Sequence, residues 1–334
     1  MSRRALVTGG CGFIGSNLVK ELIKQGWTVD VVDNMSNGDI GLIEGVAEIR
    51  VLPNSSFLNA YKQQEIDRTN DKILMIEDDF ASLGMLMYIN DEHYDVVFHQ
   101  AAVPRVSYSV ENPAETTHEN LTKTVALFEA CVGSVDRVVF ASSSSVYGGA
   151  DDLPTSESHQ KSPKSPYAWQ KSAIEDMAVI AGDLYKLDIV CLRYFNVFGP
   201  GQYGDSPYAT AVSAWCHAAK NDKPCRSDGD GTQSRDLCYV DNVVNANILA
   251  ANSSATFYGK CYNIACGDRT SNNEILSYFR KNFNVTVNSA PWRPGDIMHT
   301  QADITAAKED LGYEPTVRFW EGLERTVEWW GLNE

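Results

Sequence analysis

Short apolar runs alternate with stretches of helical periodicity along the first part of the chain. Six runs are apolar enough for helices to cover both faces of a strand, and they span residues 5–8, 28–32, 73–76, 96–99, 138–141 and 189–194. After the first run, Ile14, Leu18 and Leu22 recur at helical spacing, and Gly26 stands where a C-terminal helix cap belongs. Strands that alternate with helices predict an α/β fold with a parallel sheet.

The pattern becomes irregular in the later part of the chain. Gly, Pro, Asp and Ser are frequent over residues 199–236, a further strand is expected at 262–265, and helical periods occur near 272–283 and 319–330. These segments predict a smaller lobe that packs onto the sheet. Residues 53–72 are polar and long for a connection, and we interpret them as a surface excursion.

Composition and charge exclude several classes of protein. The 334 residues include 28 Lys and Arg against 44 Asp and Glu, a formal charge of −16, which disfavours nucleic acid and anionic membranes as partners. No run approaches the roughly eighteen apolar residues of a membrane span, and the chain enters its first strand directly after Arg4, so a cytoplasmic location is expected. Eight cysteines without CxxC pairs predict buried reduced thiols and no metal site.

A glycine-rich motif follows the first predicted strand directly. Residues 9–15 read GGCGFIG, which places Gly9, Gly12 and Gly15 where a tight turn, a pyrophosphate and a helix–strand contact leave no room for side chains. Asp33 ends the second strand, and its carboxylate can accept from both adenosine ribose hydroxyls while it repels a 2′-phosphate. The combination predicts a site for NAD rather than NADP. The alternative is a glycine-rich turn beside a surface aspartate.

Tyr167 and Lys171 are four residues apart and would project from one face of a helix that begins near Pro166. An ammonium group and an oxidised nicotinamide beside the phenol would favour the phenolate, which brings a general base toward neutral pH. Four serines, residues 142–145, follow a predicted strand, where hydroxyls could meet a substrate alcohol. The spacing also occurs by chance and the serines could form a polar loop, so each signal gains force from the others.

These motifs together resemble the extended short-chain dehydrogenase/reductase family, in its nucleotide-sugar epimerase and dehydratase branch. Residues 98–102, 146–148 and 193–200 add to the resemblance, which spans essentially the whole chain. Residues 229–236, 262–270 and 293–303 resemble UDP-N-acetylglucosamine 4-epimerases. The resemblance implies an NAD-dependent UDP-sugar 4-epimerase, acting on UDP-GlcNAc and UDP-GalNAc through a transient 4-keto sugar.

The resemblance also implies a division of labour along the chain. Residues 1–195 plus about 237–265 would form a Rossmann-type, doubly wound NAD-binding domain, and about 196–236 plus 266–334 a mixed C-terminal substrate lobe that binds the nucleotide sugar. Tyr167 would be the base, Lys171 would lower its pKa and anchor the nicotinamide ribose, and Ser143 would hydrogen-bond the sugar 4-hydroxyl.

Further residues are implied in binding. The residues implied to bind NAD are Gly9, Gly12, Phe13, Ile14, Gly15, Asp33, Asn34, Ser36, Asn37, Gly38, Asp79, Phe80, Gln100, Ala101, Ala102, Asn120, Tyr167, Lys171, Tyr194 and Val197. Those implied to bind the UDP-sugar are Ser142, Ser143, Ser144, Ser145, Tyr167, Asn196, Thr210, Ala211, Trp215, Arg226, Asp228, Arg235, Arg293, Asp296 and Thr300. Arg235 and Arg293 would clamp the diphosphate, because a guanidinium fork matches phosphate oxygens, although each alone could be a solvated surface charge.

Substrate choice rests on fewer positions. Thr300 stands where epimerases that reject N-acetylated sugars carry a bulky aromatic, so its small side chain would leave room for a 2-acetamido group. UDP-glucose or UDP-glucuronate 4-epimerase activity stays open, since residues 108–113 also resemble the glucuronate group, although Ser107 stands where that group tends to have arginine. A dehydratase is disfavoured because Ser144 and Ser145 replace its acidic pair.

Two other classes of function remain as alternatives. A non-catalytic dinucleotide-binding sensor would typically lack the tyrosine or the lysine, and a net oxidoreductase would accumulate NADH. Relatives commonly dimerise through helices that correspond to residues 113–132 and 166–185, so a homodimer is expected. The chain departs from the family pattern in lacking a glycine after Asn120 and in the sequence of residues 77–80, and Arg105 has no role that the sequence assigns.

Overall fold

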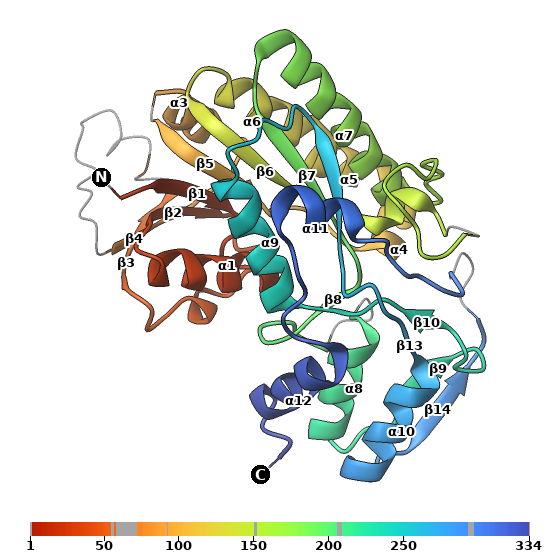
Figure 1. Ribbon diagram of the computed structural model, residues 1–334. Coiled ribbons are helices and arrows are strands. Elements are labelled where there is room, and N and C mark those ends of the chain that lie inside the picture. The colour runs from red at the N-terminus through yellow and green to blue at the C-terminus, as the bar shows by residue number, and fades with distance from the viewer. Residues whose placement is uncertain are drawn as a thin grey trace. The chain divides into compact units, whose positions relative to one another are not determined.

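The computed structural model describes residues 2–54, 57, 72–91, 93–149, 152–205, 209–292 and 297–333 (Figure 1). The chain divides into two compact units. The first unit comprises Met1–Ser142, Ser165–Leu192 and Ala246–Cys261, and the second comprises Ser143–Lys164, Arg193–Asn245 and Tyr262–Glu334.

The first unit holds most of the regular α/β alternation. Its elements are β1 (Arg4–Thr8), α1 (Phe13–Lys24), β2 (Thr28–Asp33), η1 (Ile40–Leu42), β3 (Glu48–Pro53), β4 (Lys72–Glu77), α3 (Leu83–Asp91), β5 (Tyr94–His99), α4 (Val106–Glu111), α5 (Pro113–Thr117), η2 (His118–Thr122), α6 (Lys123–Cys131), β6 (Val135–Ser143), α7 (Pro166–Tyr185) and β7 (Ile189–Tyr194). The last residues of β6 and β7 belong to the second unit, as do the first part of α9 (Val240–Asn252) and the last part of β12 (Lys260–Ile264).

The strands form one eight-stranded sheet in the order β12-β7-β6-β5-β1-β2-β4-β3. The pairings that run from β3 through β4, β2, β1 and β5 to β6 are all parallel. The chain order changes direction between β1 and β5, which is the switch point where such sheets bind ligands. The predicted Rossmann-type, doubly wound parallel sheet is therefore confirmed, and each of the seven predicted strands overlaps an observed one.

Within the eight-stranded sheet, β3 is the strand that the hydrophobic pattern did not predict. It pairs with β4 at the end of the sheet, and of its six residues only Leu52 is buried. An edge strand meets solvent along one side and tolerates charges such as Glu48 and Arg50, which hide its strand character in the sequence.

Most of residues 53–72, interpreted from the sequence as a surface excursion, lie outside the described residues. Phe57, however, is fully buried, and its ring meets the ring of Tyr88 edge-on with centroids 5.1 Å apart. At this residue the interpretation is wrong, because Phe57 belongs to the hydrophobic core.

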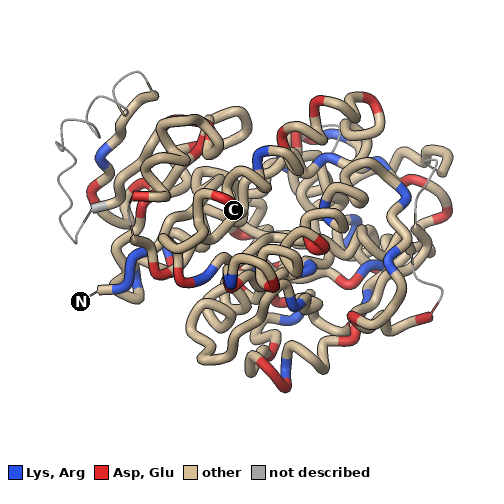
Figure 2. Tube along the Cα trace, turned by 90° about the horizontal axis from the view of Figure 1, so that it is seen from above, with Lys and Arg blue, Asp and Glu red and all other residues tan. Residues whose placement is uncertain are grey.

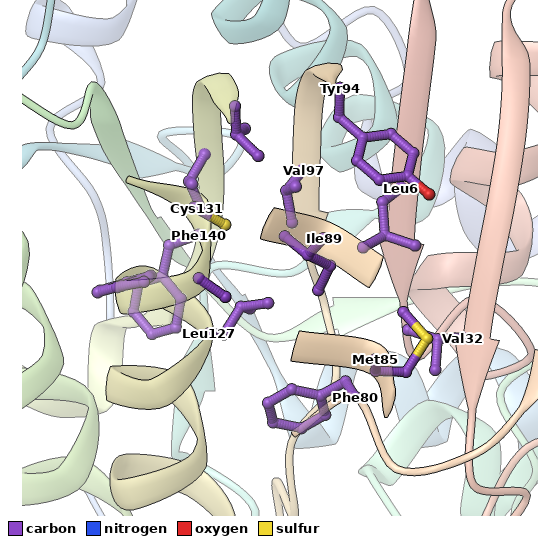
Figure 3. Close-up of a cluster of buried hydrophobic side chains, with 14 of the residues drawn as sticks. Leu6, Val32, Phe80, Met85, Ile89, Tyr94, Val97, Leu127, Cys131 and Phe140 are labelled. Atoms are coloured by element: carbon purple, nitrogen blue, oxygen red, sulfur yellow. The ribbon is translucent and has the colours of Figure 1, made fainter. Parts of the chain in front are cut away.

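The core of the first unit joins the sheet to α3, α6 and α7. Figure 3 shows side chains of α3, among them Met85 and Ile89, together with Leu127 of α6, Val97 of β5 and Phe140 of β6. All five are fully buried, and each such side chain contributes roughly 1.5–3 kcal/mol. This packing holds the carboxyl ends of the central strands in place as a platform for a binding site.

The second unit is built from short elements. They are η3 (Ser144–Tyr147), β8 (Val197–Phe198), α8 (Ala211–Lys220), β9 (Cys225–Asp228), β10 (Ser234–Arg235), β11 (Cys238–Tyr239), β13 (Thr270–Ser271), α10 (Asn272–Phe283), β14 (Val287–Ala290), α11 (Thr305–Leu311) and α12 (Phe319–Trp329). Strands β10 and β13 pair antiparallel, whereas β11 with β8 and β14 with β9 pair parallel, so the predicted mixed lobe is confirmed. A capping box between Ser271 and Glu274 begins α10.

Most of the cysteines are buried, as the sequence predicts. In Figure 2, Lys and Arg positions are interspersed with Asp and Glu along the trace. All eight cysteines are free thiols, and all but Cys261 are buried. Within the described part of the chain, no helix is long and apolar enough for a membrane span, and no cluster of three or more His, Cys, Asp or Glu side chains could hold a metal ion.

Candidate functional site

The turn between β1 and α1 has the close backbone approaches that its glycines predict. Gly9 has a φ of +67°, and a Cβ built there would lie 2.8 Å from Ala101 Cα. A Cβ on Gly15 would lie 2.1 Å from the carbonyl oxygen of Gly9. Gly12 is the N-cap of α1 and has no side chain to cap the helix. The first backbone amides of this twelve-residue helix can therefore bind an anion. The turn therefore fits a pyrophosphate.

Asp33 is fixed between this turn and the loop after β2. Its Oδ2 accepts from Cys11 N at 3.0 Å, and its Oδ1 accepts from Met35 N at 2.9 Å. Burial raises the pKa of Asp33, and these two backbone bonds oppose the rise. The same loop carries Asn37, whose Oδ1 accepts from Arg105 Nη2 at 2.7 Å. Arg105 therefore links the loop after β5 to the loop after β2.

Two residues predicted to bind NAD, Asp79 and Phe80, already have protein partners. Lys123 Nζ lies 2.5 Å from Asp79 Oδ2 and also donates to Glu119. Phe80 is buried, and its ring meets the His99 ring at 4.9 Å. Contact of either residue with NAD stays a prediction, and Lys123 is an ion-pair partner of Asp79 that the sequence did not reveal.

A buried polar chain joins β1, β5 and α6 behind the turn. His99 Nδ1 lies 2.7 Å from Thr8 Oγ1, and His99 Nε2 lies 2.8 Å from Thr124 Oγ1. Thr124 donates its own proton to the carbonyl of Asn120, so we assign His99 Nε2 as the donor to Thr124 and His99 Nδ1 as the acceptor from Thr8. Burial lowers the pKa of His99 to about 3, which keeps the ring neutral.

Helix α7 carries the predicted catalytic pair. Ser165 caps it by accepting from Ala168 N, and Pro166 occupies the first turn. Tyr167 and Lys171 are 8% and 3% exposed, and the spacing places both side chains on one face. Lys171 Nζ donates to the carbonyl of Ala141 at 2.7 Å. Burial lowers the pKa of Lys171 to about 7, so the ammonium group of Lys171 can lose its proton near neutral pH.

Asn120 holds this helix to Val103, which lies in the loop between β5 and α4. Its Oδ1 accepts from Val103 N at 2.7 Å, and its Nδ2 donates to Val103 O and to Gln170 Oε1. Gln170, which lies between Tyr167 and Lys171 in the sequence, is fully buried and donates to Thr116 Oγ1. Asn120 lies in η2, a π-helical turn. Gln170 was missed because a glutamine within a helical period carries no chemical signal in the sequence.

The four serines separate into different environments. Ser142 is buried, and its Oγ donates to Glu175 Oε1 at 2.6 Å. In the second unit, Ser143 Oγ accepts from Ser145 N at 3.2 Å and so caps η3, which leaves its own proton to donate. Ser145 Oγ is buried with no hydrogen-bond partner among the described residues. Ser144 begins η3.

Three predicted substrate residues meet in the second unit. Asn196 Nδ2 donates to Thr300 Oγ1 at 3.2 Å. Thr300 Oγ1 also accepts from Asp236 N, and Thr300 N donates to Ser234 O. Arg235 follows Ser234, and its Nη1 donates to the carbonyl of Met298 at 3.1 Å. The side chains of Asn196 and Thr300 are therefore in contact. The two backbone groups that Thr300 binds belong to the residues on either side of Arg235.

A second predicted group lies around α8 and β9. Trp215 is buried and donates from Nε1 to the carbonyl of Arg226, which pairs with Asp228 at 2.8 Å. Thr210 and Ala211 begin α8. Arg293 and Asp296 lie outside the described residues.

Comparison with known proteins gives a family match over most of the chain. The model described as "NAD dependent epimerase/dehydratase family" matches residues 5–265. A protein of Methanocaldococcus jannaschii named "Putative UDP-glucose 4-epimerase" is 32% identical over 334 residues, which cover 98% of both chains.

Two solved structures show how varied the sugars of similar proteins are. UDP-N-acetylglucosamine 4-epimerase from Methanobrevibacter ruminantium M1, in complex with UDP-N-acetylmuramic acid, is 32% identical with a TM-score of 0.87, and the match covers 100% of this chain and 99% of that one. UDP-glucuronic acid 4-epimerase from Bacillus cereus, with UDP-glucuronic acid and NAD, is 29% identical with a TM-score of 0.83, and covers 99% and 100%.

Proposed function

The chain belongs to the NAD-dependent epimerase/dehydratase family, and on that premise we propose that it reversibly inverts C4 of a UDP-hexose. The observation that carries the proposal is the buried Tyr167 and Lys171 pair on one face of α7. The predicted family and the predicted NAD cofactor are confirmed.

The residues present fit NAD. The glycine turn leaves space for a pyrophosphate at the start of α1, and Asp33 lies at the end of β2, where the adenosine ribose is expected. When bound, NAD accepts a hydride from the sugar and returns it. We assign the first unit to the cofactor and the second to the nucleotide sugar.

The chain's own residues would handle the proton and the diphosphate. Tyr167 as phenolate takes the proton of the 4-hydroxyl, and the Lys171 ammonium stabilises that phenolate. Ser143 can donate to the same sugar oxygen because its Oγ proton is not needed for its capping bond. Asn196 and Arg235 would hold the diphosphate, and Arg293 and Asp296 stay as further proposed contacts.

We propose UDP-GlcNAc and UDP-GalNAc as the substrates. The support is Thr300, whose side chain contacts Asn196 and is smaller than the bulky aromatic carried there by epimerases that reject N-acetylated sugars. UDP-glucuronate is the second candidate, favoured by the resemblance of residues 108–113. Separate incubations with UDP-Glc, UDP-GlcNAc and UDP-GlcA, with C4 inversion read by proton NMR, would decide, and a clear preference for UDP-GlcA would refute the substrate assignment.

Replacement of the base tests the reaction itself. Tyr167→Phe should lower turnover by about 10²–10⁴-fold, the usual contribution of a general base, and should leave NAD bound. Tyr185→Phe is the matched control, since Tyr185 ends the same helix and is 54% exposed. Near-normal turnover in Tyr167→Phe would refute the assignment.

We also propose a homodimer through the helices that cover residues 113–132 and 166–185. Apolar side chains on the outer face of α7 favour an interface, since Trp169, Ile180 and Leu184 are 49%, 47% and 67% exposed. Light scattering would measure the mass in solution, and a monomer would refute the proposal.

A further inference from the structure

Glu175 is a buried carboxylate that the proposed reaction does not use. It lies on α7, one turn beyond Lys171 and two turns beyond Tyr167, so the three side chains share one face of the helix. Its side chain is 2% exposed. A buried ionised carboxylate is unfavourable unless hydrogen bonds and a countercharge compensate its lost hydration.

Two consecutive residues of β6 hold Glu175 and Lys171. Ser142 Oγ donates to Glu175 Oε1 at 2.6 Å, and the carbonyl of Ala141 accepts from Lys171 Nζ at 2.7 Å. The first distance is typical of a hydroxyl that donates to an ionised oxygen. The Ser142 hydroxyl would therefore stabilise an ionised Glu175, and the strand end that leads into Ser143 fixes the side chains of both Glu175 and Lys171.

The groups that face Lys171 come from four elements. They are the Tyr167 ring at 5.8 Å and Glu175 on α7, the Phe140 ring at 4.6 Å on β6, Cys191 on β7 and His99 on β5. His99 is neutral because its burial lowers its pKa to about 3. Burial is the largest effect on the pKa of Lys171 and lowers it, whereas Cys191 and then Glu175 raise it. Within this set Glu175 is the carboxylate.

We propose that Glu175 is a positioning residue that keeps Lys171 protonated and thereby keeps Tyr167 available as a phenolate. This inference rests on the proposed function, because it concerns the same proton transfer. Lys171 and Tyr167 can share one proton in two ways. The Glu175 carboxylate favours the state with a Lys171 ammonium and a Tyr167 phenolate over the state with a neutral amine and a neutral phenol. Its direct repulsion of the phenolate is weaker, because Glu175 is two turns from Tyr167 and one turn from Lys171.

The test is a pH titration of the phenolate in the NAD-loaded enzyme, read from the ultraviolet band of ionised tyrosine. The spectrum of Tyr167→Phe is subtracted so that only Tyr167 contributes. Glu175→Gln keeps the shape and an oxygen for Ser142 but removes the charge. Its phenolate midpoint should move to higher pH by about one to two units, the effect of a charge about 6 Å away at intermediate polarity.

Two variants serve as controls. Asp183→Asn removes a charge from an exposed position on the same helix and should leave the midpoint unchanged. Glu175→Asp keeps the charge on a side chain one methylene shorter, so its phenolate midpoint should stay close to that of the original protein.

The outcomes separate a charge effect from a structural one. If Glu175→Gln retains NAD and titrates as the original protein does, Glu175 is only structural and the inference is wrong. If Glu175→Gln does not fold, Glu175→Asp decides, because an alkaline shift to the range of a free phenol would overturn the inference and a near-original midpoint would support it. The titration needs no sugar, so a failed turnover test on Tyr167 would refute the proposed function separately.

Discussion

Gly15→Ala tests whether the turn after β1 is built for close backbone contact. A Cβ at residue 15 would lie 2.1 Å from Gly9 O, 2.8 Å from Gly9 C and 2.9 Å from Gly10 Cα. All three atoms are backbone, so the turn must move by about 1 Å to reach an ordinary contact distance, and such overpacking costs about 1–3 kcal/mol. If the bound cofactor requires the original turn, a cost of about 2 kcal/mol lowers NAD affinity about 30-fold.

The assay measures NAD content and stability separately. After gel filtration, acid-released NAD per protomer should fall well below that of the original protein, and urea unfolding should give a free energy of unfolding lower by the same 1–3 kcal/mol. Gly26→Ala is the matched control at the other end of α1. Gly26 has a φ of +80° with nothing within 4 Å of an added Cβ, so the variant should lose about 1–2 kcal/mol from left-handed backbone strain and keep its NAD. Full NAD content and unchanged stability in Gly15→Ala would refute the reasoning.

Two further predictions concern a buried histidine and a partly buried arginine. Burial lowers the pKa of His99 to about 3 from its ordinary 6.5, so the neutral ring contributes stability above pH 6.5 that is lost as the pH falls toward 3. The free energy of unfolding should drop by up to about 1.4 kcal/mol per pH unit in that range, and urea titrations of His99→Gln should lack this part of the slope; an equal slope would contradict the assignment. Arg137 donates to Asp188 at 2.7 and 2.8 Å and to the carbonyls of Ala250, Ser253 and Ala255, so Arg137→Ala should cost about 3–5 kcal/mol in urea unfolding. Arg137→Lys should recover only part of that loss because an ammonium lacks the planar fork, and full recovery would show that charge alone matters.

The central sheet was predictable because its strands are buried on both faces. Runs such as residues 96–99 and 189–194 contain few polar positions, and such runs are typical of parallel strands. Strand β3 was not predictable, because its charged residues lie at an edge where solvent accepts them. The start of α7 followed from Ser165 and Pro166, which cap helices by a known mechanism.

The site was predictable where the chemistry is local in sequence. The glycine turn, Asp33 and the Tyr167 and Lys171 spacing each carry their own signal. The partners of Asp79 and Lys171 could not be predicted, because Lys123 and the carbonyl of Ala141 approach from distant segments. The contact of Arg105 with Asn37 could not be predicted either, because it joins the loop after β5 to the loop after β2.

The π-helical turn η2 sets the rotational phase of the segment that faces α7 and β5. In a regular α-helix every fourth residue advances about 40° beyond a full turn, so residues at such spacing drift off a common face. The wider turn takes more residues per revolution and reverses that drift, which keeps Thr116 and Asn120 directed at Gln170 and Thr124 directed at His99. The length of residues 118–122 is consequently as constrained as their chemistry: a one-residue deletion would give a more regular helix and would misdirect either the residues before it or those after it.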